Sequence, residues 1–304
     1  TVMISADVTD QGGWVGAVVV ENNGVRLAVP TKSEPGAGAN VTRVTFTVPL
    51  VPGANRIGVR AATADGSREA AAAEVELSRP VTPGERGRLY FVAVGGGDAT
   101  KDVRALTELL RGRGGKLFDR VDVVPVFDTQ ATRTAVEDTI RDVAELTRPQ
   151  DTLVVLLCGR GGFAGDRVYF APHDLRAGDD LLKRGIALDD IAAAVGTARA
   201  LNRVLVVDAT ASGDDPNGRS EFGLRGTVER WGRAHGLHVL AAVGATPPAL
   251  ARSLLGAADA TDVTDWLQSA TERANLPAER MEHARPVVQI STRAKGFPLL
   301  SGGK

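Results

Sequence analysis

The sequence predicts two domains of different fold class: an all-β immunoglobulin-like sandwich over residues 1–79 and an α/β domain over residues 88–304. Three observations lead to this prediction. A length of 304 residues is typical of about two domains. The first part contains short β-type runs without helical periodicity, whereas apolar runs and helical patterns alternate in the rest. Between them, the Pro- and Gly-rich stretch RPVTPGERG predicts a linker over 80–87.

The composition is that of an ordinary globular protein. Hydrophobic residues make up 43%, charged residues 24%, and the net charge is -1, so no basic excess indicates a nucleic-acid partner. We find no apolar stretch of about 18 residues and no signal peptide, so we expect no membrane span. The chain starts at Thr1 rather than Met, which leaves open a processed product or a piece of a longer polypeptide. The compartment is unknown from these residues, with the cytoplasm as the default expectation.

Short β-type runs separated by turn clusters fill the first domain. The alternation of Val44, Phe46 and Val48 with polar residues predicts a half-buried strand, and Asn23-Gly24 predicts a hairpin turn. The expected strands are Val2–Val8, Val15–Val20, Val25–Val29, Val41–Val51, Asn55–Ala61 and Ala70–Leu77. This number of short strands indicates an immunoglobulin-like sandwich with a structural or docking role.

Alternating strands and helices fill the second domain, which indicates a mostly parallel sheet flanked by helices. The expected strands are Leu89–Val94, Val121–Phe127, Thr152–Cys158, Arg167–Ala171, Val204–Val207, Leu237–Val243 and Pro286–Ile290. Helices are expected from Val103 to Gly112, after an N-cap at Thr132, over Ile191–Val195, around Thr227–Ala234 and over Thr264–Ala274.

The buried strand Val204–Val207 leads into Asp208 and a turn of small residues, Ala209–Gly213. In open parallel sheets, catalytic and ligand-binding groups gather just past the carboxyl ends of such strands. Position 210 is therefore where a nucleophile is expected, and threonine stands there. The earlier strand Thr152–Cys158 ends in Gly159-Arg160-Gly161-Gly162, which we interpret as a tight turn.

Several motifs together resemble one family. They are LYFVAVG, DTQATRTAVEDTI, QDTLVVLLCGRGG, DRVYFAPHD, GIALDDIAAAV, RVLVVDATASG and STRAKGFPLL. Through them, residues 88–300 resemble the caspase-like domain of bacterial caspase and metacaspase homologues, in which an Ig-like module also occurs beside such a domain. The resemblance implies a catalytic histidine in a Ser-Gly-His-Gly-type turn after the third strand. It also implies a cysteine nucleophile in an Asp-x-Cys-x-Ser-Gly turn after a later strand.

Both catalytic positions of that family are replaced here: the histidine position is Arg160 and the cysteine position is Thr210. The family's chemistry needs a thiolate, whose pKa of about 8.5 is lowered by a neighbouring histidine. A threonine hydroxyl needs a stronger base, and a guanidinium has no acceptor for a proton. We therefore expect no catalytic residue, and a pseudo-protease that acts with a protein partner as a scaffold, regulatory or assembly subunit.

Two other functions stay open at this point. An active peptidase or hydrolase could use rewired residues among Thr210, Cys158 and His173. A small-molecule sensor could use the vacated cleft.

Other family positions are retained. Asp208 stands where metacaspase-like relatives have an acid that helps to hold a basic substrate residue, and Gly159 and Gly161 would border the same former pocket. The simpler interpretation is that these small residues and the acid are needed by the fold. A sharper hypothesis is that Arg160 reaches Asp208 and fills the pocket as an internal pseudo-substrate.

The remaining chemistry-bearing residues give no cofactor or metal site. Cys158, the single cysteine, excludes an internal disulfide framework, and at the end of a buried strand we expect it to pack as a small hydrophobe. The histidines, which lack metal-ligand spacing, are His173, His235, His238 and His283. Gly95–Gly97 lacks the pattern of a phosphate loop, and Asp214–Gly218 is interpreted as an exposed turn rather than a Ca²⁺ site.

Overall fold

The computed structural model divides the chain into two compact units, Thr1–Glu85 and Arg86–Lys304, and each is described by itself. The division falls inside the stretch 80–87 that was expected to be a linker. The described residues are 1–12, 15–29, 31–64, 69–96, 99–176, 179–210, 219–244, 250–275, 287–292 and 294–301.

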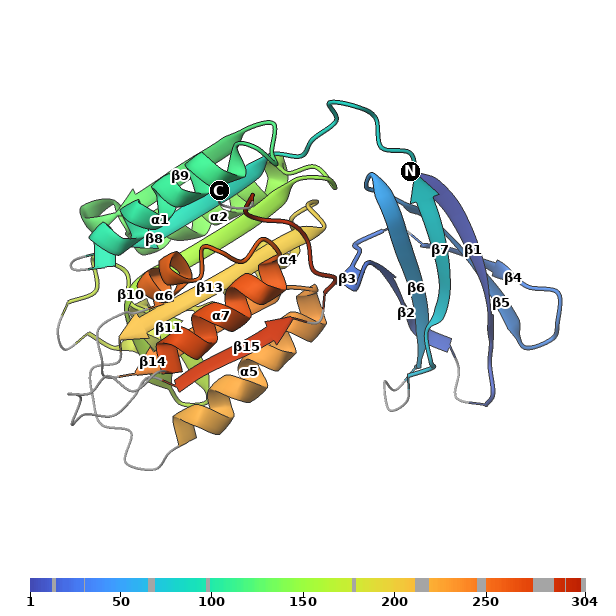
Figure 1. Cartoon of the computed structure of the whole chain (residues 1–304). Coiled ribbons are helices and arrows are strands. Elements are labelled where there is room, and N and C mark those ends of the chain that lie inside the picture. Colours follow the sequence, from blue (N-terminus) through green and yellow to red (C-terminus); the bar gives the residue numbers. More distant parts are fainter. Residues whose placement is uncertain are drawn as a thin grey trace. The chain divides into compact units, whose positions relative to one another are not determined.

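The N-terminal unit consists of two antiparallel sheets (Figure 1). One sheet has the order β1-β5-β4, with β1 Val2–Thr9, β5 Val41–Val48 and β4 Thr31–Pro35. The other has the order β3-β2-β6-β7, with β3 Val25–Arg26, β2 Val15–Asn22, β6 Gly53–Thr63 and β7 Ala73–Arg79. Strand β4 was not expected, because its five residues are all exposed and lack apolar alternation.

The core of this unit is small and aliphatic. Its buried residues are Val20, Val44, Phe46, Val48, Ile57 and Val59. The alternating burial along β5 confirms the half-buried strand predicted there, because Val44, Phe46 and Val48 face the core. The predicted hairpin is also confirmed: Asn23 and Gly24 have φ of 54° and 80° between β2 and β3, as a tight two-residue turn requires.

The C-terminal unit is an α/β domain whose described strands form one large mixed sheet (Figure 1). Across it the order is β9-β8-β10-β13-β14-β15, and all neighbours are parallel except β14 and β15. The bounds are β8 Leu89–Gly95, β9 Val121–Phe127, β10 Thr152–Ala164, β13 Asn202–Thr210, β14 His238–Gly244 and β15 Val287–Thr292. Two short strands, β11 Arg167–Phe170 and β12 Ile186–Ala187, continue the sheet from the far end of β10.

Helices cover both faces of this sheet, so side chains from alternate strand positions enter two separate cores. Helices α1 (Ala99–Gly114), α6 (Leu250–Gly256) and α7 (Val263–Asn275) pack with one core, around Trp266. Helices α2 (Arg133–Leu146), α4 (Leu188–Gly196) and α5 (Arg219–His235) pack with the other, around Trp231. A four-residue helix, α3 (Leu181–Arg184), precedes β12. Thr132 caps α2 as expected, since its side chain accepts a hydrogen bond from Ala135 N.

One sequence interpretation is wrong. The predicted turn Gly159–Gly162 is a continuation of β10, which runs on to Ala164 and pairs with β11. These glycines have no positive φ, unlike Gly165 (φ 68°) in the turn that follows. Close packing against β11 accounts for Gly159 and Gly161 instead, as shown below.

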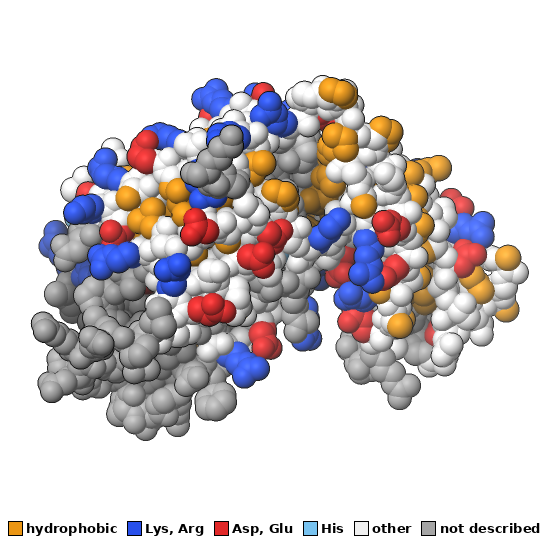
Figure 2. Space-filling view, viewed as in Figure 1, with side chains coloured by type: hydrophobic (Ala, Val, Ile, Leu, Met, Phe, Trp, Pro, Cys, Tyr) orange, Lys and Arg blue, Asp and Glu red, His pale blue; other side chains and the backbone are white. Residues whose placement is uncertain are grey.

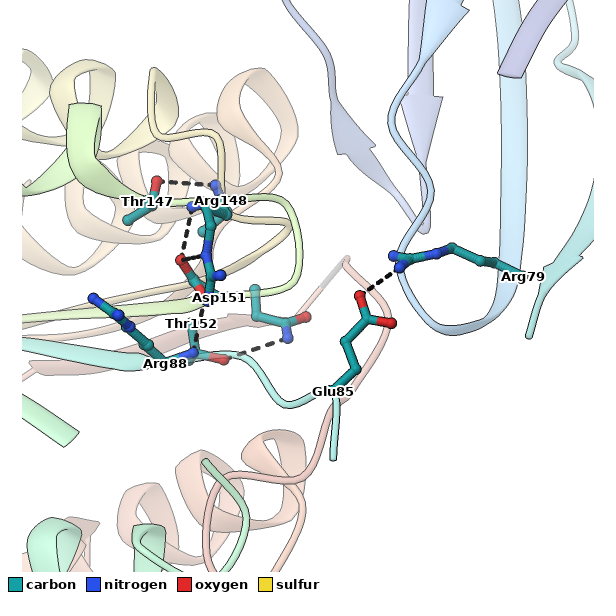
Figure 3. A network of polar contacts seen from close by, with 9 residues as sticks. Arg79, Glu85, Arg88, Thr147, Arg148, Asp151 and Thr152 are labelled. Atoms are coloured by element: carbon teal, nitrogen blue, oxygen red, sulfur yellow. Dashed lines mark hydrogen bonds and ion pairs between the residues drawn. The ribbon is translucent and has the colours of Figure 1, made fainter. Parts of the chain in front are cut away.

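A buried carboxylate fixes the starts of two central strands. Asp151 accepts hydrogen bonds from Arg88 N and Arg148 N, both 2.8 Å long, and from the Arg148 guanidinium (Figure 3). The contact ties the residue before β8 to the residue before β10, so these strands begin in register. Within the N-terminal unit, Arg79 forms an ion pair with Glu85 (Figure 3).

Candidate functional site

The two positions singled out in the sequence lie on neighbouring strands. Strands β10 and β13 run parallel, and their register places Arg160 opposite Thr210. Neighbouring strands are about 4.8 Å apart, so two side chains at paired positions can reach one substrate. The sheet order also changes direction between β8 and β10, and ligands commonly bind at such a switch point.

Arg160 fastens the loop that follows β11. Its side chain is exposed, and its Nη2 donates a hydrogen bond of 2.9 Å to the carbonyl oxygen of Leu175. Its own carbonyl accepts from Ala171 N at 2.8 Å. His173 lies in this loop, with an exposed side chain and a backbone N–H that donates to Ala131 O. The guanidinium therefore holds the loop that follows β11.

Asp208 is buried, with 3% of its surface exposed, on the sheet face that packs against α1, α6 and α7. One carboxylate oxygen, Oδ2, accepts a hydrogen bond of 2.6 Å from Leu250 N, the first residue of α6. The same oxygen lies 3.8 Å from the Cys158 thiol. An Arg160–Asp208 contact is not found among the described residues, whereas each of the two has another partner. The arrangement does not support the internal pseudo-substrate hypothesis.

Cys158 is fully buried, as expected for a small core residue. Burial raises the pKa of its thiol far above the ordinary value, and the charge of Asp208 and their hydrogen bond raise it further. A nucleophilic cysteine needs the opposite environment, with partial exposure and nearby positive charge. Cys158 is therefore unsuited to act as a nucleophile.

Close backbone approach explains the glycines beside Arg160. A Cβ atom at Gly161 would lie 2.6 Å from the carbonyl oxygen of Tyr169 and 3.0 Å from the Ala209 side chain. A Cβ atom at Gly159 would lie 3.3 Å from the Phe170 ring. A side chain at Gly161 would therefore clash with the backbone of β11, whereas one at Gly159 would press against the Phe170 ring. Their role at a former pocket stays a prediction.

The other candidate residues do not assemble a metal site. Among the described residues, no group of three or more His, Cys, Asp or Glu could hold a metal ion. His238 is buried on β14, where one ring nitrogen lies 3.2 Å from Lys295 O. His283, Gly97 and the turn Asp214–Gly218 lie outside the described residues. In the described part of the chain, no helix is long and apolar enough to cross a membrane.

Sequence reasoning missed two polar centres, around Asp189 and around Arg203. Asp189 on α4 accepts hydrogen bonds from Trp231 Nε1 (2.6 Å), Arg230 (2.9 Å) and Arg167 (3.1 Å). Arg203, at the start of β13, is 3% exposed and donates to the backbone carbonyls of Gly196 at the end of α4, Ala200 after it, and His235 at the end of α5. Both fix the helices that flank β13 rather than bind a ligand.

Comparison with known proteins gives no family for the chain. No protein-family model matches it, and no curated protein matches it significantly. Among solved structures, protein GSU0716 from Geobacter sulfurreducens is 14% identical, over 72% of this chain and 100% of that one, with a TM-score of 0.44. A similarity of this size carries no inference about function.

Proposed function

We propose that the C-terminal unit is a caspase-like domain without peptidase activity that serves as a scaffold, regulatory or assembly subunit, beside an Ig-like N-terminal module. The register of Arg160 opposite Thr210 carries the proposal. The two positions that the resemblance assigns to a histidine and a cysteine are neighbours on parallel strands, as a catalytic pair would need to be. What they hold is a guanidinium and a hydroxyl.

The chemistry of these two side chains disfavours hydrolysis by the family mechanism. A guanidinium cannot accept the proton that a nucleophile must lose, and Arg160 already donates to Leu175 O. In a well-studied catalytic triad, loss of the nucleophile or the base alone lowers kcat by about 10⁶. The single native thiol, buried beside the Asp208 carboxylate, offers no substitute.

Peptide hydrolysis tests the loss of activity. The full chain is incubated with fluorogenic peptides that carry Arg, Lys or Asp before the cleaved bond. We expect no turnover and no covalent labelling by a peptidyl chloromethyl ketone, measured by intact mass. Turnover that disappears in Thr210→Ala, or labelling at Thr210, Cys158 or His173, would instead establish the alternative of a rewired hydrolase.

Restoring the family residues tests the geometry separately. In Arg160→His/Thr210→Cys, the introduced thiol should be labelled faster than in Arg160→Gln/Thr210→Cys, because an imidazole at the paired position lowers the thiol pKa whereas a neutral amide does not. Equal labelling rates in the two variants would contradict the assigned positions. A scaffold role further predicts that the native protein co-purifies from its source with a different protein, and purification without one would contradict that role.

A further inference from the structure

The N-terminal unit has four edge strands in its described residues: β1 and β4 in one sheet, β3 and β7 in the other. Edge strands expose unpaired backbone N–H and C=O groups, which can pair with another chain. Natural proteins protect such edges with short strands, charged side chains or proline.

Three of the four edges carry such protection. Strand β3 has only two residues. Strand β4 carries Lys32, Glu34 and Pro35. Strand β7 carries three charged side chains, Glu74, Glu76 and Arg79, of which Glu74 forms an ion pair with Arg56 on β6.

Strand β1 lacks these devices. It is eight residues long and pairs with β5 alone among the described strands. Its one charged residue, Asp7, forms an ion pair of 2.8 Å with Arg43 on β5, so the edge carries little net charge. Met3 is 73% exposed, the highest value among the large hydrophobic residues described.

The inward face of β1 is also incompletely covered. Val2, Ile4, Ala6 and Val8 pack against the core but stay only half-buried, whereas Phe46 and Val48 on the neighbouring strand are buried. Figure 2 shows apolar surface on the N-terminal unit, where Figure 1 labels β1, β5 and β7. A further strand beside β1 would bury this surface and pair its free backbone groups.

We infer that the occupant is β1 of a second copy of this chain, paired antiparallel about a two-fold axis at Ser5. The inward-facing residues of β1 have even numbers. They lie opposite one another only in a register in which the numbers of two paired residues add to an even total. With Ser5 on the axis, Val2 pairs with Val8 and Ile4 with Ala6, and Met3 lies opposite Asp7. All four inward apolar residues of each copy gain a partner.

Other registers are poorer. A shift by one residue places the apolar face of one strand opposite the polar face of the other. A shift that puts Ala6 on the axis leaves Val2 without a partner. The pairing with Ser5 on the axis is closed, since each β1 then has a neighbour on both sides, and the assembly stops at two copies. This inference does not rest on the function proposed for the C-terminal unit.

Disulfide trapping of the full chain tests the register. In Ser5→Cys, the two introduced thiols lie opposite each other within the Cα separation of about 7 Å that a disulfide tolerates. In the control Met3→Cys they lie about 14 Å apart, four residues along the strand. Native Cys158 is buried and does not compete. We expect a cross-linked dimer on a non-reducing gel for Ser5→Cys at a rate at least about tenfold above that for Met3→Cys.

Light scattering tests the dimer itself. The native chain should have the mass of two copies, and Ser5→Lys, which places like charges opposite each other, should weaken the dimer about tenfold. Thr47→Lys, on the exposed face of β5 one strand further in, should leave the mass unchanged. Circular dichroism checks that both variants fold. A monomeric native chain, equal cross-linking of the two cysteine variants, or a dimer unaffected by Ser5→Lys would overturn the inference.

Discussion

Replacement of Arg203 by methionine tests what holds β13 in place. The Arg203 Nε donates to Ala200 O at 2.6 Å, and Nη1 donates to Gly196 O at 2.8 Å and His235 O at 3.2 Å. Nη2 donates to Ala198 O. Among the described residues no carboxylate compensates this cation, and burial lowers its pKa to about 10. The hydrogen bonds to the four carbonyl groups therefore stabilise the charged Arg203 guanidinium in the interior.

Methionine keeps the length of the stem but provides no donor. A buried acceptor left without a partner costs about 1 kcal/mol or more, so Arg203→Met should lower the free energy of unfolding by about 3–5 kcal/mol. For a unit of this size the melting temperature should then fall by about 6–20 °C. The emission of Trp231 and Trp266, both buried in this unit, reports its unfolding in a Trp14→Phe background.

The matched control is Arg199→Met, four residues earlier and exposed, which should change the stability by less than about 0.5 kcal/mol. A loss below about 1 kcal/mol for Arg203→Met would refute the reasoning, because water would then have to satisfy the freed carbonyls.

Two further predictions concern pH. Burial lowers the pKa of His238, so its neutral form stabilises the fold above the unfolded-state pKa of about 6.5, and this contribution is lost as the pH falls further. Chemical denaturation between pH 7.5 and 5 should show a steeper loss of stability in the native chain than in His238→Gln, and parallel profiles would contradict this. Burial alone would raise the pKa of Asp189, but hydrogen bonds from Trp231 and two arginines outweigh it and lower the pKa. Asp189→Asn should therefore cost about 1–2 kcal/mol at neutral pH and progressively less below about pH 4, and a pH-independent cost would argue for a packing effect.

The sequence predicted the elements whose periodicity is strong. Buried runs such as Val204–Val207 are strands, and α2 begins after Thr132 as expected, because local patterns and caps determine them. Strand β4 and helix α6 were not predicted from the sequence, and each has a physical reason. The first is an exposed edge without apolar alternation, and the start of the second is held by Asp208, 42 residues away.

The candidate site was predictable in position but not in contacts. Strands β10 and β13 start in register at Thr152 and Asn202, so residues equally far from these starts are paired, as Arg160 and Thr210 are. Which group each side chain contacts depends on loops and on a helix from other parts of the chain. Arg160 therefore binds the carbonyl of Leu175, and Asp208 holds α6, neither of which local sequence could indicate.

The glycines beside Arg160 have a consequence for how such a domain evolves. Any side chain at Gly161 collides with the backbone of β11, so the path of the strand end cannot be altered there by a single substitution. Arg160, immediately before it, is exposed, and its side chain contacts a loop rather than the backbone of a neighbouring strand. Because the backbone at Gly161 is fixed and the side chain at position 160 is exposed, a substitution at position 160 can change the functional group there without changing the fold. A fold built in this way can lose or acquire a chemistry within a few substitutions.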